Sequence, residues 1–284
     1  MLEFLMLLEF LKNILNQPAN VFNDNLNNIN TLYKSENFVE IKNFKIDPNQ
    51  ISAQNVLIKE IKGPILYQKN AQEQKTIASL TKLMTSLVAL NIYSPTEKFE
   101  IQKDYPEKQT EFKKGEAFYL NDLLKTLLIA SSNSAAEIIQ DKIGKKEFIK
   151  YMNKMAETLN LNQTIFEDAI GISSNNKSSL NDLYNLSEFI IKNKPEIFKY
   201  SREASFVLKG EIIRYIYNTN KLIEKYPSII FGSKTGYTED AGQCLIMILK
   251  FEKSPLIFVG LLNSKNREAD GDYIIKTLKE YYHK

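Results

Sequence analysis

Strand-like segments rich in apolar and β-branched side chains lie toward both ends of the chain. Of all the features of the sequence, they place the strongest limits on the fold class. They are residues 55–61, 65–67, 205–208, 212–217, 229–237, 244–251 and 256–262. The last of them follow one another with only short turns between them, and strands joined in this way pair antiparallel. The first two form a hairpin pattern around Gly63-Pro64 and can join the same sheet.

The middle of the chain has helical periodicity instead. Apolar residues recur every three or four positions after polar starts, which predicts helices at 76–91, 120–130, 134–143, 145–159, 179–192 and, last, 268–282. The first of these is apolar over most of its surface, which indicates a buried helix. The expected fold class is α/β: a mostly antiparallel sheet flanked by helices, with an inserted all-helical subdomain.

The N-terminal segment has a different composition. Residues 1–15 are mostly apolar but include Glu3 and Glu9, and residues 16–37 contain eight asparagines. A helix of about 1.5 Å per residue over 1–15 would be shorter than a hydrocarbon core of about 30 Å. It is compatible with an in-plane membrane anchor, with the end of a signal anchor that begins upstream, or with packing on the domain. We divide the chain into an N-terminal segment with its linker, 1–48, and a folded domain, 49–284.

Charge and the counts of histidine and cysteine exclude several classes of protein. The net charge is +3, from 37 basic and 34 acidic residues, too small for the phosphate-neutralising surface of a nucleic-acid-binding protein. The single histidine, His283, is the penultimate residue, so a Ser-His-Asp or Cys-His site has no well-placed imidazole. With Cys244 alone there is no ordinary zinc, haem or iron–sulfur site, although carboxylates could bind Mg²⁺ or Ca²⁺. We expect no cofactor and no metal.

The segment Ser79-Leu80-Thr81-Lys82 places a hydroxyl and an amine on one face of a predicted helix. Lys82 could take the serine proton if its pKa fell from about 10.4 toward 7, which needs about 4 to 5 kcal/mol from desolvation and cationic neighbours. The alternative is a hydroxyl at a helix start and a lysine that extends to the surface. A second match, Ser174 to Lys177, lies in a polar loop without helical geometry.

Ser131-Ser132-Asn133 falls where one predicted helix ends and the next begins. The following Ser134 and Glu137 have the spacing of a capping box, so helix capping explains part of this cluster. By itself the Ser-x-Asn pattern carries little weight, because it recurs elsewhere in the chain.

Lys234-Thr235-Gly236 occurs once, on a predicted strand. The glycine permits close approach of another backbone or a ligand, and the lysine and threonine could bind a carboxylate. The alternative is an exposed strand face. A phosphate-binding loop is excluded because Ser233 separates Gly232 from Lys234.

In this order, Ser-x-x-Lys, Ser-x-Asn and Lys-Thr-Gly are closely related to the motifs of penicillin-binding proteins and class A β-lactamases. From about residue 50 to 284 the chain resembles serine-type D-alanyl-D-alanine carboxypeptidases, which are penicillin-binding proteins of low molecular mass with a β-lactamase/transpeptidase-like fold. Further segments resemble the family in order: ILYQKNAQEQKTIASLTKLMTSLVAL, LLIASSNSAAE, NTNKLIEKYP, GSKTGYTEDAGQCL and NREAD.

The resemblance implies a role for each matching residue. Ser79 would attack the penultimate D-Ala carbonyl with Lys82 as its base, and Ser131 would relay a proton to the leaving amine. Asn133 would hold the peptide and orient Lys82. The remaining binding residues would be Lys234 and Thr235 for the terminal carboxylate, Gly236 beside them, Tyr237 with Ser79 for the backbone N–H groups of the oxyanion hole, and Arg267 as a further carboxylate partner. Lys234 would also supply the positive field that keeps Lys82 neutral.

The implied partners are a peptidoglycan stem peptide as substrate and β-lactams as covalent inhibitors. The charge predicts no nucleic-acid partner, and membrane association through residues 1–15 is one of the alternatives for that segment. The implied location is outside the cytoplasmic membrane, although no convincing export signal is present. Residues 167–172 replace the family's usual Asn-Pro-x-Gly-Leu, and Lys177 replaces an aromatic residue, so deacylation can differ. The alternatives are a serine β-lactamase and a non-catalytic module that binds wall peptides. Glu157 to Asn160 resembles a β-lactamase deacylation loop only superficially.

Overall fold

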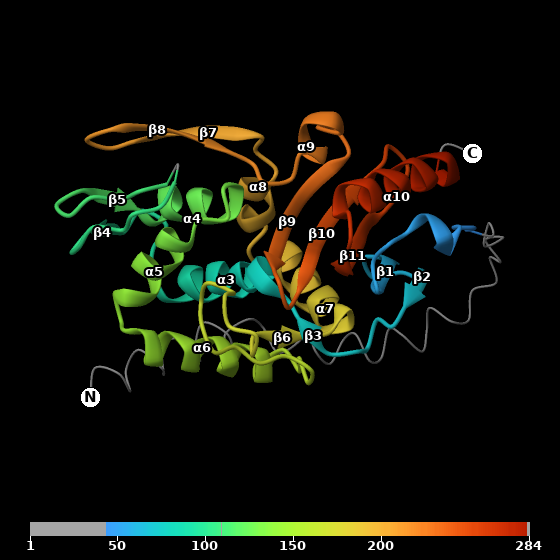
Figure 1. Ribbon diagram of the computed structural model, residues 1–284, viewed down its shortest axis with the longest axis horizontal. Helices are drawn as coiled ribbons and strands as arrows, with labels where there is room; N and C mark the ends of the chain where they lie inside the picture. The colour runs from blue at the N-terminus through green and yellow to red at the C-terminus, as the bar shows by residue number, and fades with distance from the viewer. Residues whose placement is uncertain (1–43, 109, 283–284) are drawn as a thin grey trace. The chain divides into compact units, whose positions relative to one another are not determined.

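A computed structural model describes residues 44–108 and 110–282. Its main sheet has five strands in the order β2-β1-β11-β10-β9 (Figure 1). The strands are β1 (Asn55–Glu60), β2 (Ile65–Lys69), β9 (Ile230–Thr238), β10 (Gly242–Lys250) and β11 (Leu256–Ser264). Every neighbouring pair is antiparallel. This confirms that the first hairpin and the last strands share one antiparallel sheet.

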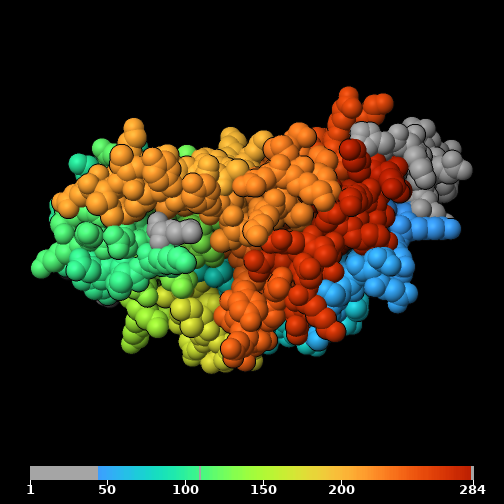
Figure 2. Space-filling model, turned by 45° about the horizontal axis from the view of Figure 1, so that its top comes forward, coloured from blue at the N-terminus to red at the C-terminus, as the bar shows by residue number. Residues whose placement is uncertain are grey.

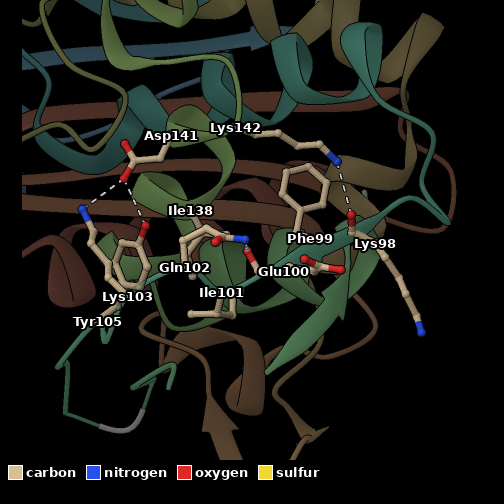
Figure 3. A pocket seen from close by; sticks show the side chains of 10 residues that line it. All are labelled: Lys98, Phe99, Glu100, Ile101, Gln102, Lys103, Tyr105, Ile138, Asp141 and Lys142. Carbon is tan, nitrogen blue, oxygen red and sulfur yellow. Dashed lines mark hydrogen bonds and ion pairs between the residues drawn. The ribbon is translucent and has the colours of Figure 1, made fainter. Parts of the chain in front are cut away.

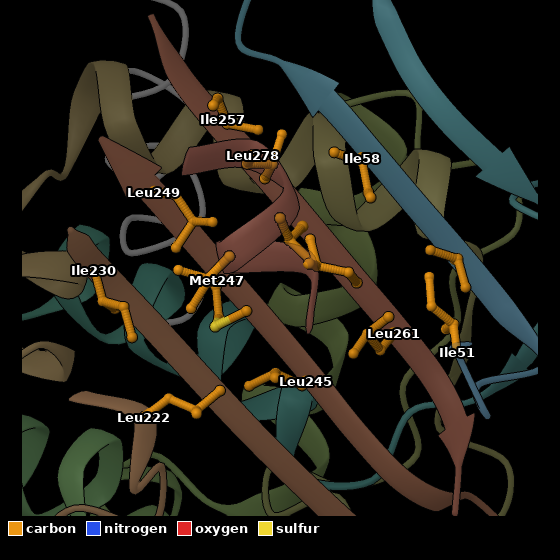
Figure 4. Packing of buried hydrophobic residues seen from close by; sticks show 14 of the residues in the cluster. Ile51, Ile58, Leu222, Ile230, Leu245, Met247, Leu249, Ile257, Leu261 and Leu278 are labelled. Carbon is orange, nitrogen blue, oxygen red and sulfur yellow. The ribbon is translucent and has the colours of Figure 1, made fainter. Parts of the chain in front are cut away.

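The apolar core lies between this sheet and the C-terminal helix α10 (Arg267–Tyr282). Side chains alternate along a strand, so Leu245, Met247 and Leu249 of β10 all face this helix, where they pack with Ile274 and Leu278 (Figure 4). Each fully buried side chain of this size contributes about 1.5–3 kcal/mol relative to an exposed one. The core therefore fixes the position of β9 and β10 from the side of the sheet that α10 covers.

A second helix, α7 (Leu180–Asn193), covers the other face of the sheet near β1 and β11. Gly260 of β11 lies against it, because a Cβ there would come within 2.6 Å of Leu180 Cδ2. The sheet is thus covered by helices on both faces, as the fold class predicts.

Most of the other helices form the helical subdomain beside the sheet. They are η2 (Ala78–Thr81), a 3-10 helix, with α3 (Lys82–Ile92), α4 (Leu120–Ile129), α5 (Asn133–Asp141), α6 (Lys145–Thr158) and α8 (Glu196–Ser201). Every residue of α3 from Lys82 to Leu90 is buried, which confirms that this helix lies inside. It extends from the edge of the sheet into the subdomain (Figure 1).

Short hairpins and turns complete the described part of the chain. They are η1 (Pro48–Gln50), β3 (Lys75–Thr76) paired with β6 (Lys177–Ser178), β4 (Lys98–Glu100) with β5 (Ala117–Tyr119), β7 (Ser205–Lys209) with β8 (Ile213–Tyr217), and α9 (Leu222–Lys225). The predicted strands at 205–208 and 212–217 therefore pair with each other and not with the main sheet. Both β4 and β5 were missed, because three residues are too few to show a strand pattern.

The predicted N-terminal segment overlaps the described residues only at its end, where Phe44 and Ile46 pack against the apolar core. The proposed boundary after residue 48 stays a prediction, and residues 1–15 lie outside the described residues. Within residues 44–108 and 110–282, no helix has both the length and the apolar character needed to cross a membrane.

Candidate active site

Ser79 lies in η2, immediately before α3. The residue before it, Ala78, has a φ of +46°, in the left-handed region that residues with a side chain seldom adopt. Thr81 Oγ1 donates a hydrogen bond to the Ala78 carbonyl (2.8 Å). The Ile77 N–H donates one to the Asn176 carbonyl (3.1 Å). These bonds hold a strained turn that leaves Ser79 half-buried, and such strain is concentrated at functional sites.

Lys82, the first residue of α3, is fully buried. Its Nζ lies 2.9 Å from Ser79 Oγ and 2.9 Å from Asn133 Oδ1. It also lies 2.6 Å from the Ile170 carbonyl oxygen. All three partners are neutral oxygens, so the amine is held in place without a direct carboxylate partner.

Burial changes the ionisation of this amine. Loss of hydration lowers the pKa of Lys82 to about 7, although the carboxylates of Glu107 and Asp168 raise it. A neutral amine has two N–H donors and one lone pair, so it can donate to two neighbouring oxygens and accept from the serine hydroxyl. The three contacts are satisfied by the ammonium form, which donates to all three oxygens, and also by the neutral form, which is the form that can act as a base.

The Ser131–Asn133 segment connects α4 to α5, as the sequence predicts. Ser131 has a φ of +60°, again in the left-handed region. Its Oγ accepts a hydrogen bond from Lys234 Nζ (2.7 Å), whereas Asn133 Oδ1 faces Lys82. The turn thus places one polar side chain against each of two buried lysines.

The start of α5 differs from the predicted capping box. The N-cap is Ser132, not Ser134, and its Oγ accepts a hydrogen bond from the third N–H of the helix (3.1 Å). The carboxylate at this helix end is that of Glu107, and not that of Glu137. Glu107 accepts hydrogen bonds from the first two N–H groups of α5 (2.9 and 3.1 Å).

Lys234, Thr235 and Gly236 lie on β9, the edge strand beside η2. Lys234 is buried, and its Nζ donates to the Thr235 carbonyl (2.8 Å) as well as to the serine of the turn. Thr235 Oγ1 lies 2.5 Å from Thr219 Oγ1. A Cβ added at Gly236 would lie 3.1 Å from the Ser79 nitrogen, so the glycine permits the close approach of β9 to η2.

Burial also lowers the pKa of Lys234 well below its usual value, and positive charge on Lys82 or Arg267 lowers it further. Arg267 Nη1 donates a hydrogen bond to the Gly236 carbonyl (2.9 Å), so the guanidinium supports the backbone of β9. The Tyr237 side chain is 62% exposed. For Lys82, loss of hydration on burial is the main cause of the lowered pKa, and not the field of Lys234 that the resemblance implies.

The 167–176 loop supplies a group that the sequence analysis missed, the Ile170 carbonyl. The buried carboxylate of Asp168 accepts a hydrogen bond from the Ile170 N–H (2.8 Å). Asn176 Nδ2 donates to Asp168 Oδ1 (3.1 Å) and to Thr81 Oγ1 (3.1 Å). This network fixes the Ile170 carbonyl against Lys82. Any residue type carries a backbone carbonyl, so no motif could mark it.

The structure therefore brings together the five residues that the three motifs predict: Ser79, Lys82, Ser131, Asn133 and Lys234. In Figure 2, part of the teal segment that contains η2 and α3 is visible at the bottom of a recess between green, yellow and orange segments. A nucleophile beside a neutral amine, with a second hydroxyl beside a second amine, is suited to acyl transfer.

The sequence also matches the family described as D-alanyl-D-alanine carboxypeptidase over residues 42–266. The chain belongs to this family. It is therefore a serine hydrolase with the penicillin-binding-protein fold, which confirms the resemblance and the fold class inferred from the sequence.

Relatives within the family have two kinds of name. A D-alanyl-D-alanine endopeptidase of Haemophilus influenzae is 31% identical over 244 residues, which are 82% of this chain and 83% of the relative. The D-alanyl-D-alanine carboxypeptidase DacF of Bacillus subtilis is 32% identical over 232 residues, 75% of this chain and 58% of DacF. A penicillin-binding protein of Listeria monocytogenes, solved in its cefotaxime-bound form, is 26% identical with a TM-score of 0.69, covering 81% of this chain and 96% of that one.

Two further residues considered in the sequence lie in other surroundings. Glu157, on α6, has a side chain that is 69% exposed and pairs with Lys154 (2.9 Å). This exposed pair gives no support to a β-lactamase deacylation loop at Glu157–Asn160. Cys244 is fully buried, and burial raises the pKa of its thiol to about 11, in agreement with a packing role.

Proposed function

We propose that the protein is a serine-type D-alanyl-D-alanine carboxypeptidase that removes the terminal D-Ala from peptidoglycan pentapeptides through an acyl-enzyme on Ser79. The observation that carries the proposal is the 2.9 Å contact between Ser79 Oγ and Lys82 Nζ, with the lysine fully buried. A hydroxyl becomes a useful nucleophile only when a base close to it can take its proton.

In the acylation step, the neutral amine of Lys82 accepts the Ser79 proton while Oγ forms a bond to the penultimate D-Ala carbonyl carbon. Charge develops on the carbonyl oxygen. We assign its stabilisation to the backbone N–H groups of Ser79 and Tyr237. The close approach of Gly236 to the Ser79 nitrogen supports this assignment, because it places the two segments side by side.

Collapse of the tetrahedral intermediate breaks the C–N bond to the terminal D-Ala. The leaving amine needs a proton, which we assign to Lys82 by way of the Ser131 hydroxyl. Asn133, which holds Lys82 at 2.9 Å, would also bind the peptide chain. Water then attacks the ester with Lys82 as base, and this step releases the shortened peptide and restores Ser79.

The terminal carboxylate of the substrate would bind Lys234 and Thr235. Burial disfavours the charged form of Lys234, and an arriving carboxylate favours it. A protonated Lys234 in turn disfavours protonation of Lys82, because the two positive charges would repel each other. Substrate binding would therefore favour the neutral form of Lys82, which is the base. Arg267 contributes to this positive field and supports the Gly236 carbonyl.

β-Lactams would acylate Ser79 as substrate mimics, a proposal supported by the β-lactam-bound structures of the Listeria penicillin-binding protein. A peptidoglycan substrate places the enzyme outside the cytoplasmic membrane. Attachment through residues 1–15 is a separate part of the proposal.

The test is to incubate the purified protein and Ser79→Ala with a fluorescent penicillin, and to follow D-Ala release from a pentapeptide. We expect covalent label and D-Ala release in the wild type, and a loss of about 10³-fold or more of both in the variant. A thermal unfolding midpoint close to that of the wild type shows that the variant is folded. Rapid loss of label without D-Ala release would indicate a β-lactamase, and no label in folded protein would leave the binding module as the better hypothesis.

Endopeptidase action is a second candidate, because the Haemophilus influenzae relative has that name. The acylation chemistry is the same, and only the leaving amine differs. The discriminating measurement compares a pentapeptide with a cross-linked dimer of stem peptides at equal concentration. A higher kcat/KM on the dimer would favour the endopeptidase.

A further inference from the structure

Glu107 lies in the loop between β4 and β5 and is half-buried. Its Oε1 accepts a hydrogen bond from the Asn133 N–H (2.9 Å). Its Oε2 accepts hydrogen bonds from the Ser134 N–H (3.1 Å) and from Ser132 Oγ (2.5 Å). Thr110 Oγ1, from the same loop, donates to Oε2 as well (2.6 Å). One carboxylate therefore binds three consecutive residues at the start of α5.

We propose that Glu107 is a positioning residue for the reaction: its carboxylate holds the turn at the start of α5 so that Ser131 and Asn133 face the two buried lysines. The inference rests on the proposed function, since this geometry matters only if the lysines take part in acyl transfer. Glu107 does not need to touch the substrate for this role.

The turn needs an anchor from outside because its own backbone is unfavourable. Ser131 has a left-handed backbone, which is strained for a residue with a side chain. The first N–H groups of α5 have no partner within the helix. Hydrogen bonds to a charged group are stronger than those between neutral groups, so the contacts of Glu107 offset this strain. Without them, the segment is free to relax away from the lysines.

The loop that carries Glu107 is itself fixed to the neighbouring hairpin. Arg214 of β8 forms an ion pair with Glu116 (2.5 Å), and their side chains are only 4% and 1% exposed. Arg214 Nε also donates to the Glu111 carbonyl (2.7 Å). A positioning side chain is effective only on a rigid support, and this buried pair provides one.

Glu107 also places a negative charge near Lys82. Two carboxylates act on this amine through their charge: Glu107 from the β4–β5 loop and Asp168 from the 167–176 loop. The amine of Lys234 on β9 also interacts electrostatically with Lys82, and Arg267 of α10 acts on Lys234 in turn. Burial lowers the pKa of Lys82, and both carboxylates oppose this effect. Removal of the Glu107 charge therefore lowers the pKa further, and Lys82 becomes neutral at lower pH.

The test measures acylation by a fluorescent penicillin from about pH 5.5 to 9.5 for the wild type, Glu107→Ala, Glu107→Gln and Glu111→Gln. Glu111 is a matched control. It lies in the same loop, and within the described part of the chain its side chain forms no hydrogen bond or ion pair. Glu107→Gln keeps the shape of the side chain, so the test stays valid if Glu107→Ala fails to fold.

We expect Glu107→Ala to lower the plateau acylation rate by about 10- to 100-fold, because small misplacements of reacting groups have effects of this size. Both Glu107 variants should move the pH midpoint down by about 0.5 unit, whereas Glu111→Gln matches the wild type. Folded Glu107 variants with a wild-type plateau and midpoint would overturn the inference. A lower plateau with an unchanged midpoint would reject the electrostatic part of the inference, because loss of the anchoring hydrogen bonds alone predicts that result. Absence of label in the wild type would instead reject the proposed function.

Discussion

Two sets of lysines in this protein have opposite surroundings. One set lines an open groove of about 500 Å³ between β4 and α5 (Figure 3). There, Lys103 pairs with Asp141 (3.2 Å) and Lys142 with Glu97 (2.5 Å), and all four side chains are partly exposed. These amines have both water and carboxylates within reach.

The other set, Lys82 and Lys234, is buried and contacts only neutral oxygens. Water stabilises the ammonium form, so the buried set has a lowered pKa. Burial therefore distinguishes Lys82, which we propose as the base, from the lysines of the groove.

The largest effect is expected for Lys82→Arg, which keeps a long basic side chain but replaces the amine with a guanidinium that cannot be deprotonated. We expect acylation by penicillin to fall by about 10³-fold or more, because the serine loses its base. The measurement is the rate of covalent labelling, with the thermal unfolding midpoint as a check on folding. Lys142→Arg is the control from the groove and should label like the wild type. A folded Lys82→Arg with wild-type labelling would contradict the assignment of Lys82 as base.

The pH dependence of the wild type gives a second test. The neutral form of Lys82 predominates above its pKa of about 7, so acylation should rise with pH through this value and then level off. One unit below the pKa only about a tenth of the amine is neutral, which predicts about a tenth of the plateau rate near pH 6. The measurement is the labelling rate at a fixed penicillin concentration. A midpoint near that of a solvated lysine would show that Lys82 is not desolvated.

The smallest effect is expected in the groove itself. Lys142→Met keeps most of the apolar stem but removes the amine, which contacts Glu97 and lies 4.0 Å from the centre of the Phe99 ring. Partly exposed ion pairs contribute about 0–1 kcal/mol, so the free energy of unfolding should fall by no more than this. Denaturant unfolding measures the change, and the penicillin labelling rate should stay that of the wild type. A loss of labelling would show that the groove and the active site are coupled.

Much of the fold could be predicted because its signals are local. The helices at 120–130 and 145–159 were placed within one residue of α4 and α6, since apolar periodicity and polar starts lie within each segment. The predicted strand at 244–251 differs from β10 by two residues at its start and one at its end. The β4–β5 hairpin was missed, because its pairing depends on residues that are distant in the sequence.

The site, too, was predictable only where its residues lie in short motifs. Ser79, Lys82 and Lys234 lie in short motifs, so their residue types and spacing could be recognised. Glu107 and Asp168 could not be found in this way, because each acts through hydrogen bonds across a loop and no fixed spacing marks them. The start of α5 shows this limit: the capping box predicts the nearby Glu137, but the carboxylate that binds the helix end is that of Glu107, which is distant in the sequence.

The left-handed backbone at Ala78 and Ser131 has a consequence for how this protein can change. Glycine adopts this conformation without penalty, so Ala78→Gly would relieve local strain while it loosens the turn before the nucleophile. At position 131 the same change would also remove the hydroxyl that accepts from buried Lys234 and leave that amine with one partner fewer. Relief of strain therefore opposes geometry at position 78, whereas at position 131 both stability and reactivity favour the serine.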